Sequence, residues 1–138
     1  MGLYLCVFDE SGDEIEGVEV GSYADFGDFR DAVTSLVEGG SLGGVCPVLT
    51  THADSDGEWS SEEAKQLYSE LTHIAGVFSK QPPVDLSVRW KLEAAKTFGL
   101  KPMNLGQCFF DVDGEELTER LKQLAKASMA SGMPINFQ

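Results

Sequence analysis

Positive charge is almost absent from the first half of this 138-residue chain. Residues 1–63 contain 15 acidic side chains and one basic side chain, Arg30, so their net charge is −14, against −13 for the whole chain. Such a surface repels phosphate groups, which argues against nucleic acids and anionic membranes as partners. The imbalance favours a basic protein as the partner, although an acidic surface also serves solubility alone.

Cysteines, long apolar runs and targeting signals are also scarce. Cys6, Cys46 and Cys108 are odd in number and far apart, which argues against a disulfide framework or a zinc knuckle and favours a reducing compartment. No apolar run approaches the roughly 18 residues that a membrane span needs, and the first residues lack the basic segment of a secretion signal. We therefore expect a cytoplasmic protein. Nothing in the sequence predicts its oligomeric state.

The sequence carries no familiar enzyme signature. It contains only two histidines, and no nucleophile elbow, phosphate-binding loop or dinucleotide fingerprint. A metal-dependent hydrolase could be assembled from His52, Asp54, Asp56 and the Asp111 pair, but only if two separate loops meet in space. We therefore predict no catalytic residues, no bound metal and no cofactor, and keep the hydrolase as a third alternative.

Hydrophobic periodicity and turn residues predict a mixed fold. Strands are expected over residues 3–8, 14–20, 45–51, 107–112 and 135–138, the last of them at an edge, and helices over about 22–38, 60–80, 88–98 and 114–131. Strands and helices do not alternate regularly, which favours the α+β class. The prediction is one domain over residues 1–138, with about four helices packed on a mostly antiparallel sheet.

The second predicted strand presents a row of acids. Its apolar alternation slips at Gly17, which predicts a β-bulge there. With that bulge, Glu14, Glu16 and Glu19 all face away from the apolar side. We expect these three carboxylates to contact a partner.

Two acidic loops resemble each other, and each precedes a predicted helix. The first reads Asp54-Ser-Asp56-Gly-Glu58, and the second reads Asp111-Val-Asp113-Gly-Glu. Paired aspartates followed by glycine are typical of EF-hand calcium loops. In the first loop Glu63 falls at the bidentate twelfth position, but His52 stands where the first carboxylate belongs. In the second loop the twelfth position is occupied by a base, Arg120.

Helix capping explains the same residues without a metal. Ser60 is expected to cap a helix with Glu63 as its capping-box partner, and Trp59 to pack as an apolar staple just before it. Asp113 is the corresponding cap for the last helix. A calcium-binding or regulatory domain that uses the loop from Asp54 to Glu63 remains the second functional alternative. The first alternative is a partner-binding protein. Its two loops are then expected to contact the partner through exposed carboxylates, namely Asp54, Asp56, Glu58, Asp111 and Asp113.

Several segments together resemble the immunity protein 70 family of bacterial polymorphic toxin systems. They are Gly-Leu-Tyr-Leu-Cys-Val-Phe-Asp from residue 2, Glu-Ile-Glu-Gly-Val-Glu-Val from residue 14, His52-x-Asp-x-Asp-Gly-Glu-Trp-Ser, Cys108-Phe-x-Asp-Val-Asp-Gly-Glu and Pro134-Ile-x-Phe-Gln. The resemblance covers nearly the whole chain. It implies a cytoplasmic, non-enzymatic protein that binds and neutralises a cognate toxin. Steric occlusion of the toxin's active site is the expected mechanism.

Overall fold

A four-stranded antiparallel sheet organises the molecule. The computed structural model describes residues 2–52 and 57–138. The strands are β1 (Gly2–Phe8), β2 (Glu14–Ser22), β3 (Glu58–Trp59) and β4 (Ile135–Phe137), in the order β2-β1-β4-β3. The α+β class and the antiparallel sheet are therefore confirmed.

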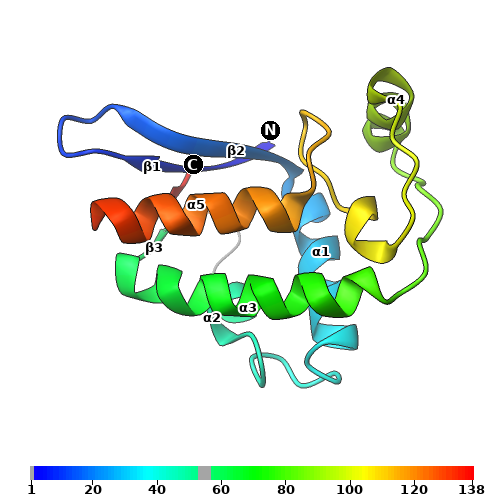
Figure 1. Ribbon diagram of the computed structural model, residues 1–138, viewed down its shortest axis with the longest axis horizontal. Coiled ribbons are helices and arrows are strands. Elements are labelled where there is room, and N and C mark those ends of the chain that lie inside the picture. The colour runs from blue at the N-terminus through cyan, green and yellow to red at the C-terminus, as the bar shows by residue number, and fades with distance from the viewer. Residues whose placement is uncertain (1, 53–56) are drawn as a thin grey trace.

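Five α-helices accompany the sheet in the described part of the chain. They are α1 (Tyr23–Leu36), α2 (Pro47–Thr51), α3 (Ser61–Ser79), α4 (Arg89–Phe98) and α5 (Leu117–Ser131), with a 3-10 turn, η1 (Leu105–Cys108). Figure 1 shows α3 and α5 side by side below the β1–β2 hairpin, whereas α4 stands apart at one end. None of the helices among the described residues is both long and apolar enough to cross a membrane.

Local capping sets the starts of the two long N-capped helices. Ser22 caps α1 and Ser60 caps α3 through reciprocal capping boxes with Asp25 and Glu63, respectively. Each box satisfies backbone N–H groups that the first helical turn cannot pair internally. The predicted start of the helix near residue 60 and its Glu63 partner are confirmed.

The hydrophobic core lies between the sheet and the helices α1, α3 and α5. Leu3, Leu5 and Val7 of the central strand β1 are fully buried. The apolar stripes of the helices complete it, with Phe26, Phe29 and Val33 from α1, Leu67, Leu71, Ile74 and Phe78 from α3, and Leu121 and Leu124 from α5. Burying each such side chain contributes about 1.5–3 kcal/mol, so this interface dominates the stability of the fold.

The strand predicted over residues 45–51 is wrong, because this segment forms the short helix α2. Pro47 occupies its first turn, where a missing N–H is tolerated. The carboxylates of Glu38 and Glu70 accept hydrogen bonds from the backbone N–H groups of residues 45–46 and 48–49. Both glutamates lie outside the segment, and Glu70 is 21 and 22 positions from its two partners. A short apolar run alone therefore could not distinguish a buried helix from a buried strand.

The strand predicted over residues 107–112 is also wrong. Its first residues belong to η1, and only Phe110 forms a bridge, with Glu116. Phe109 is nevertheless buried, packing against Phe29 and Phe78. The apolar run reflects burial against helices and not pairing in a sheet.

Two details of the sheet also differ from expectation. The β1–β2 register shifts at Ile15 and Val20, not at Gly17. Gly17 instead makes room for Tyr4, because a Cβ at this position would lie 2.1 Å from the tyrosine Oη. The last strand, β4, lies between β1 and β3 and is not an edge, because the two residues of β3 pair with its outer side.

Candidate partner-binding surfaces

The acids of β2 line one edge of the sheet. Glu14 and Glu19 are exposed, and Glu16 is half-buried. The Tyr4 hydroxyl donates a hydrogen bond to Glu14 Oε1 (2.6 Å), and the guanidinium of Arg120 forms an ion pair with Glu16 Oε1 (3.3 Å). Of the three side chains, Glu19 therefore has the fewest hydrogen bonds and ion pairs within the described part of the chain.

The turn that contains Asp111 and Asp113 lies beside this edge. The Val112 backbone N–H donates to the Glu19 carbonyl (3.1 Å), which places the turn against β2. Asp113 is exposed, whereas the side chain of Asp111 is only 1% exposed. Glu14 and Glu19 pair with Phe8 and Tyr4 and face away from the core, but Glu16 pairs with the buried Val7 and points toward Arg120 of α5, so the prediction that all three acids face away is wrong for Glu16. We call the edge formed by Glu14, Glu16, Glu19 and Asp113 the β2 surface.

Asp111 supports the β2 surface from inside. Its Oδ1 accepts hydrogen bonds from the backbone N–H groups of Asp113 (3.0 Å) and Glu115 (2.9 Å), and its Oδ2 lies 3.3 Å from Arg120 Nε. Arg120 also donates to the Gly17 carbonyl (2.6 Å). The prediction that Asp113 caps the last helix is wrong, because α5 begins after Glu116 without a side-chain cap and Asp111 holds the turn instead.

Of the other acidic loop, the structure describes Glu58, which lies at the opposite edge of the sheet. Glu58 is exposed on β3, and Asp54 and Asp56 lie outside the described residues. Because neighbouring strands are about 4.8 Å apart, β2 and β3 are separated by roughly 14 Å across the sheet. The structure therefore brings Asp113 to the β2 acids and keeps Glu58 away from them.

The base of this second loop is rigidly built. Arg30, the only base in residues 1–63, donates to the carbonyls of Thr50 and His52 (both 2.6 Å) at the C-terminal end of α2. The His52 ring stacks on Phe137, with centroids 4.3 Å apart, and its Nε2 lies 2.9 Å from the Glu58 carbonyl. These contacts anchor both ends of the loop. Sequence reasoning missed this role of Arg30, because its partners are more than 19 positions away.

Comparison with known proteins agrees with the motifs of the sequence. The family model described as immunity protein 70 matches residues 3–137. The chain belongs to the immunity protein 70 family. No curated protein and no solved structure shows significant similarity to it.

Three described residues that the calcium or hydrolase hypotheses would use, Ser60, Glu63 and His52, have structural contacts in this immunity protein. Ser60 and Glu63 bond each other's backbone in the capping box, and His52 is held by Phe137 and the Glu58 carbonyl. Among the residues that the structure describes, no three His, Cys, Asp or Glu side chains gather as a metal site.

We expect calcium to leave the stability of this immunity protein unchanged, because the twelfth-position acid Glu63 is already committed to the helix cap. Thermal unfolding in 5 mM calcium and in a chelator should give midpoints within about 1 °C. A ligand at 100 times its dissociation constant adds about 2.7 kcal/mol, which moves the midpoint of such a domain by several degrees. A rise of that size would restore the calcium hypothesis.

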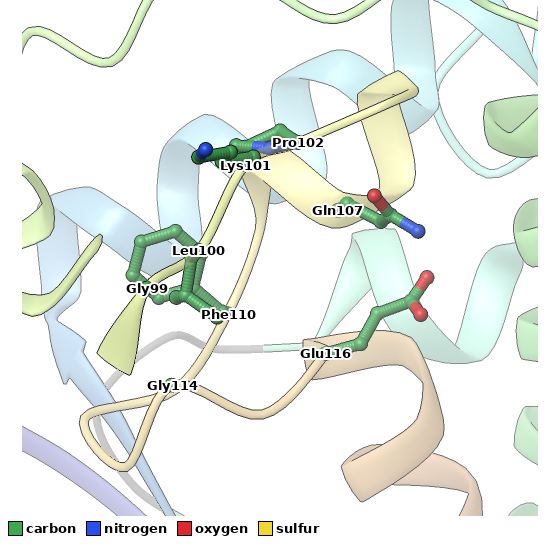
Figure 2. Close-up of a pocket in the computed structure, with 8 residues that line it drawn as sticks. All are labelled: Gly99, Leu100, Lys101, Pro102, Gln107, Phe110, Gly114 and Glu116. Carbon is green, nitrogen blue, oxygen red and sulfur yellow. The ribbon is translucent and has the colours of Figure 1, made fainter. Parts of the chain in front are cut away.

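A cavity of about 310 Å³ lies under the C-terminal end of α4. Figure 2 shows Gln107 and Glu116 on one side of it and Leu100 and Phe110 on the other. With Lys101, its lining offers one carboxylate, one ammonium and one amide. This set lacks the paired nucleophile and base that covalent catalysis needs, so the cavity does not suggest an enzyme.

The two buried carboxylates at α2 have opposite pKa shifts. Burial raises the pKa of Glu38, but hydrogen bonds from the backbone at residues 45–46 and 43 outweigh it, so the pKa lies below its usual value. Burial raises the pKa of Glu70, and the hydrogen bonds from residues 48–49 offset this only in part. A carboxyl group whose pKa is lower in the folded chain than in the unfolded chain stabilises the fold at pH values above its unfolded pKa. A carboxyl group whose pKa is higher in the folded chain stabilises the fold at pH values below its unfolded pKa.

Glu38→Gln and Glu70→Gln are therefore expected to show opposite pH dependence. Glu70→Gln leaves one of the N–H groups of residues 48–49 facing an amide NH₂, at about 1–3 kcal/mol. Glu38→Gln keeps one oxygen for the N–H groups of residues 45–46 and loses the negative charge that strengthens those hydrogen bonds. The cost of Glu38→Gln should be largest at pH 7 and shrink as the pH falls through the lowered pKa. The cost of Glu70→Gln should grow as the pH falls from 7 through the raised pKa. Urea unfolding from pH 3.5 to 7 measures both, and parallel trends would contradict the assignment.

Proposed function

We propose that this immunity protein neutralises a cognate toxin by binding it and covering its active site with acidic surface. Membership of the family supports toxin neutralisation as the role. The observation that carries the rest is the concentration of charge, because residues 1–63 have a net charge of −14. A partner with a basic active-site cleft is the natural complement of such a surface.

The β2 surface is the proposed centre of contact. Glu19 and Asp113 are exposed there, and both are attached to backbone that is hydrogen-bonded to the neighbouring element. Arg120 and Asp111 hold this region in place from below. Carboxylates presented on rigid backbone bind with little ordering cost, which favours affinity.

The loop of Asp54, Asp56 and Glu58 is the proposed second contact. Its two ends are anchored by α2 and β3, as described above. Because Glu58 lies at the opposite edge of the sheet from the β2 surface, a toxin that touches both would have to span the sheet.

The proposal is tested with the cognate toxin domain, expected to be encoded beside this chain's gene. Toxin activity should fall linearly with added immunity protein and reach zero near one equivalent. Substrate should compete with the complex, because both occupy the active site. The absence of a complex contradicts the neutralising role, whereas a complex that remains fully active contradicts occlusion only.

A further inference from the structure

Lys91 of α4 is a buried cation without a polar partner. The residue is only 7% exposed, and within the described part of the chain its ammonium has no hydrogen bond and no ion pair. Burial lowers its pKa, as desolvation of a cation does. An ammonium has three N–H donors and needs an acceptor when it is removed from water.

Three aromatic rings surround this ammonium without supplying an acceptor. The Lys91 Nζ lies 5.1, 5.8 and 5.9 Å from the ring centroids of Phe109, Phe110 and Trp90. Cation–π contacts of this kind favour the charged form. The nearby carboxylate of Asp25 is already bonded to Trp90 Nε1 (2.9 Å) and to the α1 cap.

A cavity of about 170 Å³ opens beside Lys91. Every fully buried side-chain N or O atom of the described residues has a hydrogen-bond partner, so the unpartnered Nζ must border space that water reaches. The walls of the cavity are largely apolar, and the exposed Asp28 and Asp85 also line it. The apolar walls come from Val84, Leu86, Val88 and Phe109.

We propose that this cavity binds a small zwitterion of the amino-acid class. The ligand carboxylate accepts hydrogen bonds from Lys91, its ammonium faces Asp28 and Asp85, and a short aliphatic group contacts the apolar walls. A simple anion lacks the ammonium that the two aspartates attract, and a simple cation lacks the carboxylate that accepts from Lys91. The volume equals that of about six water molecules, which suits a ligand the size of alanine. This inference does not depend on the proposed toxin binding.

The test is an NMR titration of the ¹⁵N-labelled chain with L-alanine at pH 7. Amide signals of residues 84–91 and 108–109 should shift and saturate at millimolar concentrations. Propionate and ethylamine are the matched probes, because each keeps one charge of alanine and lacks the other. Both should bind at least tenfold more weakly. No saturable shift up to 100 mM, or propionate binding as well as alanine, would overturn the proposal.

Two variants locate the site. Lys91→Met keeps the apolar stem and should abolish alanine binding, whereas Lys96→Met, on an exposed residue of the same helix, should leave it unchanged. Asp85→Asn lies on the exposed segment before α4, so it tests the site even if Lys91→Met does not fold. It should weaken alanine several-fold and leave propionate no weaker. Unchanged alanine affinity in a folded Lys91→Met or in Asp85→Asn overturns the assignment.

Discussion

Trp59→Ala is expected to lower the free energy of unfolding by about 3–5 kcal/mol, the range for removing a large buried aromatic. Trp59 is fully buried on β3, and its ring meets Phe137 edge-on with centroids 4.7 Å apart. Its Nε1 donates to the Val48 carbonyl (3.0 Å), which ties β3 to α2. Urea denaturation followed by far-UV circular dichroism measures the loss.

Trp59→Phe separates the two contributions of this side chain. It keeps an aromatic ring but removes the N–H, so it should lower the free energy of unfolding by less than the alanine variant does. The expected loss has two sources, the unpaired Val48 carbonyl, at about 1–3 kcal/mol, and a small void. Both variants should weaken toxin binding only in proportion to the unfolded fraction. Full stability with lost binding in Trp59→Ala would instead make the tryptophan a contact residue.

Reversing charge on the β2 surface is expected to slow association with the toxin about tenfold or more at low ionic strength. The variant is Glu19→Lys with Asp113→Lys, because Glu14 and Glu16 already bond Tyr4 and Arg120. Electrostatic steering changes association rates by 10- to 1,000-fold and acts mainly on the encounter. Stopped-flow mixing at several salt concentrations measures the rate. The difference should fade near 0.5 M salt.

The matched control is Glu62→Lys with Glu93→Lys. It makes the same change in net charge on exposed faces of α3 and α4, where the only ion pairs lost are exposed ones worth little. A separate Glu58→Lys variant examines the opposite edge of the sheet. Equal slowing by the control pair would show that net charge alone matters, and that the β2 surface is not the place of docking.

The sequence by itself determined the features that depend on neighbouring residues. The Ser22 and Ser60 caps each find their partner three residues later, so the starts of α1 and α3 could be predicted. The apolar stripe of α3 followed in the same way. The acidic bias of residues 1–63 and the family motifs likewise needed no coordinates.

Tertiary structure alone decided the rest, because the partners lie far apart in the chain. Residues 47–51 form the helix α2, whose N–H groups at residues 48–49 bond Glu70, more than 20 positions away. Pairing of β4 with both β1 and β3 put Glu58 at the edge of the sheet opposite to β2. Folding also buried Asp111 under Arg120 and enclosed Lys91 among aromatic rings. Local patterns predict which backbone bonds close within one helical turn, but the surroundings of a side chain depend on how distant elements pack.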